Sequence, residues 1–174
     1  MSLAIVYTRA ALGIEAPLIT IEVHLSSGLP GLTMVGLPET TVKEARDRVR
    51  SALINSGYAF PAKKITINLA PADLPKEGGR YDLPIALALL VASEKLNTTR
   101  LNQYEFVGEL ALTGGLRGVP GAIPSAMEAI KAGRRIVVSS DNAAEVGLIG
   151  GSDCLVADHL QQVCAFLAGQ ASLS

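Results

Sequence analysis

The amino-acid sequence predicts a single domain of the α/β (α+β) class, in which helices pack against a mixed β-sheet. The chain has 174 residues, a length that suits one domain with its own core. Hydrophobic residues make up 49% of the chain and aromatic residues only 4%, so the core must consist mainly of Val, Ile, Leu and Ala. Strand-like segments come first and alternating helical and strand-like segments follow, which is typical of a mixed sheet covered by helices.

The N-terminal segments predict three strands. Residues 3–12 and 18–26 are apolar runs on either side of a turn at Gly13, and residues 32–37 form a shorter run after a turn-forming cluster. Apolar and polar residues alternate within residues 18–26, as in a strand with one buried face. We therefore expect this strand to form an edge or a face of an antiparallel pair.

Residues 38–57 predict the first helix. Thr41 and Glu44 have the spacing of a capping box, and Gly57 lies where a helix-ending glycine belongs. The predicted buried face is an apolar stripe made of Val42, Ala45, Val49, Ala52 and Leu53. A strand over residues 63–71 is expected to follow.

Residues 83–96 predict a second helix that is buried on all sides. Asp82 is a favourable N-cap, and Pro84 is tolerated in the first turn, where no intrahelical donor is needed. Residues 85–92 are all apolar, and a helix without a polar face belongs inside the domain.

The C-terminal half predicts further strands and helices in alternation. Two strands within residues 104–119 are joined by a turn at Gly114 and Gly115. The remaining segments predict a helix over residues 124–133, a strand over 135–140, a weak helix over 141–149, a strand over 154–158 and a final helix over 159–169 capped by Asp158. We expect residues 1–169 to form one domain, and residues 170–174 to be a frayed tail or the start of a linker.

Composition limits the classes of function. The net charge is −1, which argues against a dedicated nucleic-acid-binding protein but leaves room for a local basic patch. Cys154 and Cys164 fit no zinc or redox motif and predict free thiols in a reducing compartment, and His24 and His159 are too isolated to predict a metal site. No apolar run reaches the length of a membrane span. We expect a soluble, cytoplasmic protein with no membrane contact and no metal.

The loop before the buried helix carries a dense group of charged residues. Its candidate site residues are Lys76, Glu77, Gly78, Gly79, Arg80 and Asp82. One interpretation is a charged site at the mouth of the buried helix; the other is that Asp82 caps the helix and Arg80 pairs with a nearby carboxylate. A phosphate-binding P-loop is not indicated, because no glycine in the chain is followed by lysine.

A basic stripe on the first helix is the second candidate site. Lys43, Arg46 and Arg50 recur at spacings of three and four, so they share one helix face. Such a stripe suits contacts with DNA phosphates or with a neighbouring subunit. It is also typical of the solvated face of an amphipathic helix, and the sequence leaves both interpretations open.

Three long segments resemble the N-terminal domain of the ComM/YifB family of magnesium-chelatase-like AAA+ ATPases. They are GLPGLTMVGLPETTVKEARDRVRSAL (residues 28–53), ITINLAPADLPKEGGRYDLPIALALL (65–90) and GELALTGGLRGVPGAIPSA (108–126). The resemblance covers nearly the whole chain. It implies a Lon-protease-like domain with a ribosomal protein S5 domain 2-like fold, followed in full-length members by an AAA+ module with Walker motifs.

The relation to Lon peptidases implies where a Ser-Lys dyad would lie. Matching the loop before the buried helix puts Arg80 at the serine position, and matching the hairpin and the helix after it puts Ile123 at the lysine position. The mechanism needs a hydroxyl nucleophile and an amine base, and neither residue supplies one. Ser125 lies near the second position but has no evident partner in the sequence. The resemblance therefore implies no catalytic residue in this segment.

The function implied by the resemblance is that of a non-catalytic accessory domain in an ATP-driven DNA branch-migration helicase. The segment itself is expected to bind no cofactor, with ATP and Mg²⁺ on an AAA+ module outside it. Expected partners are that module and neighbouring subunits of a homo-hexamer, with DNA as a further candidate. Two alternatives are a DNA-binding module in its own right and a hydrolase with a non-standard site, such as Asp82 with Lys76.

Overall fold

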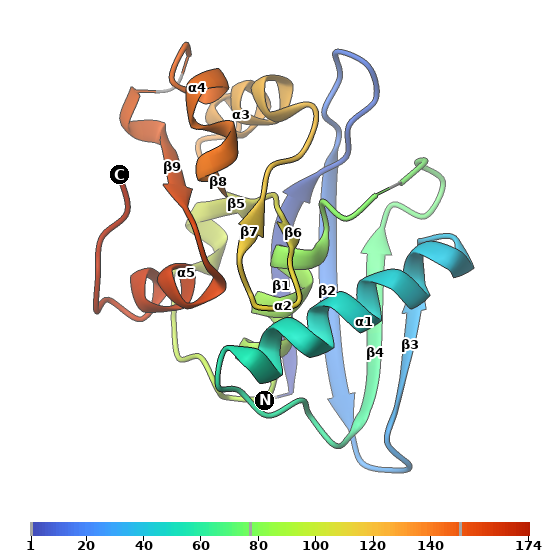
Figure 1. Ribbon diagram of the computed structural model, residues 1–174. Helices are drawn as coiled ribbons and strands as arrows, with labels where there is room; N and C mark the ends of the chain where they lie inside the picture. The colour runs from blue at the N-terminus through green and yellow to red at the C-terminus, as the bar shows by residue number, and fades with distance from the viewer. Residues whose placement is uncertain (1, 77, 150) are drawn as a thin grey trace.

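A seven-stranded mixed sheet forms the centre of the protein in the computed structural model, which describes residues 2–76, 78–149 and 151–174 (Figure 1). The strand order is β3-β4-β2-β1-β5-β8-β9. These strands are β1 (Leu3–Arg9), β2 (Leu18–Ser26), β3 (Gly31–Val35), β4 (Lys64–Ala70), β5 (Tyr104–Phe106), β8 (Arg135–Ser139) and β9 (Cys154–Ala157). The predicted mixed sheet packed with helices is confirmed.

The two halves of the sheet are built differently. β2 is antiparallel to both of its neighbours, β1 and β4, whereas β5, β8 and β9 add in parallel beyond β1. The alternation predicted for β2 is confirmed, because its buried side chains are Ile19, Ile21, Val23 and Leu25. β2 lies inside the sheet and not at its edge, and the edge on that side is β3, which pairs in parallel with β4.

Helix α1 (Glu39–Asn55) begins earlier than its predicted capping box. Thr41 and Glu44 lie inside the helix, and the N-cap is Pro38, whose side chain makes no capping hydrogen bond. The proline side chain carries no acceptor, so the free N–H groups in the first turn of α1 receive no side-chain cap from this residue. The prediction of a capping box was therefore wrong.

The end of α1 is as predicted. Gly57 adopts φ +91°, and its N–H donates to the Ile54 carbonyl at 3.1 Å. The next N–H, of Tyr58, donates to the Leu53 carbonyl at 2.9 Å, which completes a Schellman motif. A left-handed residue at this position favours glycine because glycine has no Cβ to collide with the backbone.

Helix α2 (Asp82–Ala92) is the buried helix that the sequence predicts. It packs against β1 and β2 on one side and against α1 on the other, and Figure 1 shows it partly hidden behind α1. All its residues except Val91 are buried. Because α2 lies between the sheet and α1, the residues at its start are positioned by several elements at once.

A hairpin of β6 (Glu109–Leu110) and β7 (Leu116–Arg117) forms a separate two-stranded sheet that contacts α1 and α2. Its turn contains Gly114 at φ +95°, where a Cβ would collide with the Ser56 hydroxyl. The predicted turn at Gly114 and Gly115 is confirmed, but the first predicted strand is divided into β5, which joins the main sheet, and β6. The chain then enters α3 (Ala122–Lys131), which packs against β8.

Helix α4 (Ala143–Val146) is a single short turn, and α5 (Leu160–Leu167) ends the regular structure. The predicted N-cap of α5 was wrong, because His159 and not Asp158 caps it. His159 has an extended backbone, its Nδ1 accepts the Gln161 N–H at 3.0 Å, and the Gln162 side chain completes a capping box. The Asp158 carboxylate instead accepts the Ser140 hydroxyl.

The division into a domain of residues 1–169 and a tail of residues 170–174 stays a prediction, although the tail makes contacts. Val156 N–H donates to the Ser174 carbonyl at 3.2 Å, and Leu173 packs against the core. Within the described residues, no helix has both the length and the apolar character needed to cross a bilayer.

Candidate functional site

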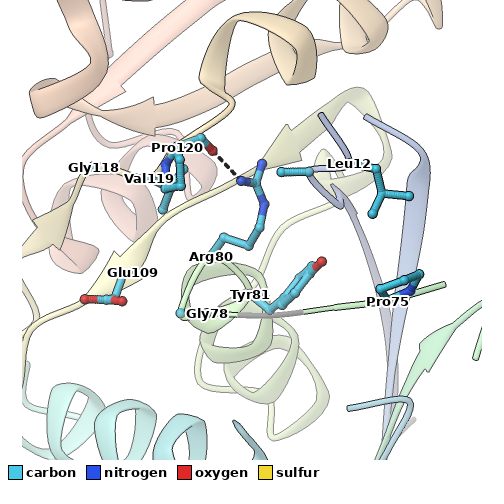
Figure 2. Close-up of a pocket in the computed structure, with 11 residues that line it drawn as sticks. Leu12, Pro75, Gly78, Arg80, Tyr81, Glu109, Gly118, Val119 and Pro120 are labelled. Atoms are coloured by element: carbon cyan, nitrogen blue, oxygen red, sulfur yellow. Dashed lines mark hydrogen bonds between the residues drawn. The ribbon is translucent and has the colours of Figure 1, made fainter. Parts of the chain in front are cut away.

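A pocket of about 400 Å³ lies where the loop before α2, the loop after β1 and the β7–α3 connection meet (Figure 2). Its walls are formed by Ala11, Leu12, Pro75, Gly78, Gly79, Arg80, Tyr81, Glu109, Gly118, Val119 and Pro120. The predicted loop cluster therefore contributes three of its members, the two glycines and Arg80, to one concave surface. This is the mouth of the buried helix that the sequence singles out.

Arg80 is the buried cation of this pocket, with 5% of its surface exposed. Its Nε donates to the Arg9 carbonyl at 2.9 Å, its Nη1 to the Pro120 carbonyl at 2.6 Å and its Nη2 to the Ser125 hydroxyl at 2.8 Å. Burial lowers the pKa of Arg80. The predicted pairing of Arg80 with a nearby carboxylate is wrong for the described residues, because all three acceptors are uncharged.

Ser125 is the residue that meets Arg80 from the next helix. The resemblance to Lon peptidases puts Ile123 at the lysine position, but the α3 side chain that contacts Arg80 lies two residues further along, and Ser125 is fully buried. Within the described part of the chain, no lysine amine is hydrogen-bonded to this serine. Arginine stays protonated at any ordinary pH, so Arg80 cannot take the proton of the Ser125 hydroxyl.

Asp82 joins three elements instead of capping its own helix. Its carboxylate accepts Nε and Nη2 of Arg48 at 2.7 and 3.3 Å and the Leu110 N–H at 3.1 Å, which ties α2 to α1 and β6. The N-cap position belongs to Tyr81, so the predicted cap was wrong. Burial raises the pKa of Asp82 to about 6, against the opposing effects of Arg48 and the Leu110 N–H.

Arg48 was not among the predicted site residues. It lies between Ala45 and Ala52 along the buried side of α1, at the helical spacings of three and four residues. A cation at the border of an apolar stripe is the signal that could have identified it, because burying a charge requires a partner. The hydrogen bonds to Asp82 raise the pKa of Arg48 despite its partial burial.

The first residues of the predicted loop cluster do not form an acid–base pair with Asp82. The Lys76 side chain is buried and its Nζ donates to the Leu74 carbonyl at 3.0 Å, and burial lowers the pKa of Lys76. Glu77 lies outside the described residues. A Cβ on Gly79 would collide with the Glu109 carboxylate, so this glycine permits β6 to approach the loop.

Tyr81 is a pocket residue that sequence reasoning missed. Its side chain is 1% exposed, and its hydroxyl has no hydrogen-bond partner among the described residues. Burial raises the pKa of Tyr81 to about 12, so the phenol stays protonated at neutral pH. In Figure 2 the ring extends away from Arg80, with its hydroxyl directed to the side on which Leu12 and Pro75 lie.

The basic stripe on α1 contributes to a second concavity, of about 630 Å³, beside the outer edge of the sheet. Arg46, Arg50 and Lys63 line it, and the Arg50 guanidinium carbon lies 5.3 Å from the centre of the Phe60 ring. Nε of Arg46 also lies 3.9 Å from Oδ1 of Asp47. Lys43 is exposed on the same helix but does not line the groove, so the structure brings together two of the three predicted residues.

Comparison with known proteins gives consistent matches. Residues 21–142 match the family described as "Subunit ChlI of Mg-chelatase". The chain is 77% identical over 173 residues to the protein YifB of Escherichia coli (strain K12) and 59% identical over 173 residues to the competence protein ComM of Haemophilus influenzae (strain Rd). It is 38% identical over 175 residues to a protein of Mycobacterium tuberculosis (strain H37Rv).

These matches cover almost all of this chain but only part of each relative. The matched regions span 99%, 99% and 100% of the chain and 34%, 34% and 35% of the three relatives. The chain therefore spans about a third of the length of the curated relatives it matches.

Proposed function

The chain belongs to the family of subunit ChlI of Mg-chelatase, as its predicted resemblance to magnesium-chelatase-like proteins implies, and we propose that it acts as a non-catalytic accessory domain. In this proposal it positions DNA or neighbouring subunits of a hexamer, while ATP and Mg²⁺ bind to a module outside the chain. The relatives support this division of labour, because the chain matches only about a third of their length.

The observation that carries the proposal is the contact between Arg80 and Ser125. The serine hydroxyl accepts Nη2 of Arg80 at 2.8 Å, so its neighbour is a permanent cation in place of a neutral amine. A serine nucleophile needs a base to remove its proton, and a guanidinium cannot act as one. Asp82 is likewise engaged by Arg48, which supports a structural role for this carboxylate.

The proposal is tested with the purified chain in two assays. We expect no ATP hydrolysis above a buffer control and no cleavage of casein. The matched variant is Ser125→Ala, which should give the same background in both assays. Casein cleavage by the natural chain that disappears in Ser125→Ala would overturn the proposal and establish a serine hydrolase.

The groove beside α1 favours a second candidate function, direct DNA binding. Arg46, Arg50 and Lys63 line the groove together with Phe60, and the Arg50 guanidinium lies over the Phe60 ring. Cations bind phosphates and release counterions, and an aromatic ring offers a face on which an unpaired base can stack. A groove of this composition therefore suits a single strand or the unpaired region of a branched DNA.

The DNA-binding candidate is tested by charge removal inside and outside the groove. The double variant Arg46→Ala/Arg50→Ala should weaken binding of branched DNA at low salt and reduce the steepness of the salt dependence, by about one unit of slope per lost phosphate contact. Lys43→Ala removes a cation from the same helix outside the groove and should have a much smaller effect. If the groove and control variants weaken binding equally, the groove is not a specific DNA site, and the binding reflects only general attraction between DNA and positive charges.

A further inference from the structure

Arg80 carries a buried positive charge that no carboxylate balances among the described residues. It donates to two backbone carbonyls and to the Ser125 hydroxyl, which are all uncharged. A guanidinium has five N–H donors, so these three bonds leave two without an assigned acceptor. Burying an ion without a counter-charge is unfavourable, and an anion that reached this group would relieve the cost.

Tyr81 supplies a second unused donor in the same pocket. Its hydroxyl is buried and has no partner among the described residues, although phenol hydroxyls inside proteins normally find one. Arg80 and Tyr81 are adjacent in the sequence, and both line the cavity of about 400 Å³. Both side chains therefore border the same cavity, and a ligand that contacts both has to reach from the guanidinium to the side on which the Tyr81 hydroxyl lies (Figure 2).

We propose that this pocket binds a carboxylate carried on a short apolar group, with Arg80 and Tyr81 as the donors. Leu12, Pro75 and Val119 supply an apolar part of the wall around them, and polar surface makes up the rest. The volume lies within the range of small-molecule pockets, which are typically apolar with a few fixed polar groups. Figure 2 shows Arg80 rising between Leu12 and Pro120, so its charged end lies among these walls.

A monoanion fits the pocket better than a phosphate group with two charges. Among the described residues that line the pocket, Arg80 is the one cation, and Glu109 adds a negative charge. The Glu109 carboxylate points away from Arg80 in Figure 2 and lies 3.9 Å from Arg117 Nη1, so it does not neutralise the guanidinium. It would still repel a dianion more strongly than a monoanion.

The carboxylate has two possible sources with the same chemistry. One is a free organic acid, and the other is the C-terminal carboxylate of a polypeptide. This inference does not depend on the proposed accessory function, because it concerns the donors of this pocket only. The two sources are distinguished by the probes of the test.

The test measures binding to the 174-residue chain by two-dimensional NMR at constant ionic strength. Sodium isovalerate and the dipeptide acetyl-Ala-Val with a free C-terminus are the carboxylate probes, and the two corresponding amides are neutral controls. We expect saturable shifts of the Gly79 and Gly118 amide signals with a dissociation constant on the order of 1 mM for at least one acid. The acid that binds more tightly identifies the source.

Variants then separate the pocket from a general structural effect. Tyr81→Phe removes only the hydroxyl and should weaken binding about tenfold, as expected for one hydrogen bond to a charged group. Ser125→Ala removes a partner of Arg80 that does not line the pocket, and should change the affinity by less than about threefold. Arg80→Gln should abolish binding while the spectrum stays that of a folded chain.

The proposal is overturned by any of three results. The first is that neither acid binds better than its amide, or that methyl phosphate, a dianion at mildly alkaline pH, binds and the acids do not. The second is that Tyr81→Phe binds as tightly as the natural chain. The third concerns Glu77, three residues before Arg80 in the sequence: binding that appears only in Glu77→Gln would mean that the chain balances Arg80 itself. Binding unchanged in Glu77→Gln supports the proposal.

Discussion

Two arginines lie buried next to each other at the end of β1, and they differ in how their charge is balanced. Arg9 is 7% exposed and Arg80 5% exposed, and Nε of Arg80 donates to the Arg9 carbonyl at 2.9 Å. Nε and Nη2 of Arg9 donate to the two carboxylate oxygens of Glu105 at 2.7 and 2.9 Å. Arg80 donates only to uncharged oxygens among the described residues.

The difference distinguishes a structural cation from one that is available to a ligand. Glu105 lies on β5 beside β1, and it also accepts Arg134 Nη1 at 3.0 Å, while the Arg134 guanidinium carbon lies 3.9 Å from the centre of the Tyr7 ring. The strand register brings these side chains together, because Tyr7 and Glu105 are partners in the parallel β1–β5 pair. Arg80 instead comes from a loop beside a cavity, where the Glu109 carboxylate of β6 lies in the lining but forms its salt bridge with Arg117.

The largest effect should come from breaking the balanced network. Glu105→Gln keeps the shape of the side chain but leaves Arg9 buried without a counter-charge, so we expect the free energy of unfolding to fall by about 3–5 kcal/mol. Urea unfolding at neutral pH measures this loss. Glu128→Gln is the matched control, because Glu128 forms an exposed pair with Lys131 and should change stability by less than about 0.5 kcal/mol. Equal effects would mean that burial of the network contributes nothing.

The pair of Asp82 and Arg48 is intermediate between Arg9 and Arg80, because its charges are paired but burial still disfavours the charged carboxylate. The stability of the chain should therefore depend on pH through Asp82. The pKa of Asp82 is raised by burial from 3.8 to about 6, so the folded state binds its proton more tightly than the unfolded state does. Stability from this group is greatest below about pH 4 and is lost as the pH rises through about 6. At 1.36 kcal/mol per pKa unit, the loss is about 3 kcal/mol.

The comparison of the natural chain with Asp82→Asn isolates this change, because the other titrating groups are common to both chains. Urea unfolding of each chain between pH 3.5 and 7.5 should show that the natural chain loses stability relative to Asp82→Asn as the pH rises. Arg48→Met removes the cation that opposes the shift, and should move the same transition to higher pH. If the natural chain instead gains stability relative to Asp82→Asn as the pH rises, pairing with Arg48 outweighs the effect of burial on the pKa of Asp82.

The contrast between the two arginines is sharpened by removing each one. Arg9→Met removes the closest partner of Glu105 and should lower the free energy of unfolding by about 3–5 kcal/mol. Arg80→Met loses three hydrogen bonds but also removes an unbalanced buried charge, so the net loss should be about 1–2 kcal/mol. Urea unfolding of both variants gives the difference. Equal losses would show that the charge of Arg80 is balanced within the chain.

The parts of the fold that depend on local sequence were predictable. The burial of α2 follows from its apolar composition, and the end of α1 follows from Gly57, because both signals lie within a few residues of the feature. The N-terminal caps were not predictable in the same way. Asp82 and Asp158 are good capping residues, but the direction in which the chain enters each helix decides which residue caps it, and other partners claim both carboxylates.

The site was predictable in its location but not in its contacts. The loop before α2 was recognised from its charged residues and from its resemblance to a peptidase loop. The pairs that define it join residues far apart in sequence, 45 positions for Arg80 with Ser125 and 34 for Arg48 with Asp82. Such pairs arise from the packing of α1, α2 and α3, and a single sequence carries no signal for that packing beyond the apolar pattern.

The smallest expected effect on stability distinguishes an unused donor from a used one. The Tyr81 hydroxyl has no partner among the described residues, whereas the Tyr104 hydroxyl accepts Arg100 Nη2 at 2.8 Å. Both rings are buried, at 1% and 4% exposure. Removing an unpaired buried hydroxyl costs no hydrogen bond and removes a desolvation penalty, so Tyr81→Phe should leave stability unchanged or raise it by up to about 1 kcal/mol.

Tyr104→Phe is the matched variant and should lower stability by about 1 kcal/mol, because it leaves a donor of Arg100 without its acceptor. Thermal and urea unfolding of both variants at neutral pH measure the two effects. If Tyr81→Phe destabilises the chain as much as Tyr104→Phe does, the Tyr81 hydroxyl already has a partner in the free protein. The hydroxyl would then not be available to a ligand. Arg80 alone would remain as an unsatisfied group of the pocket, in contrast to the charge-balanced Arg9.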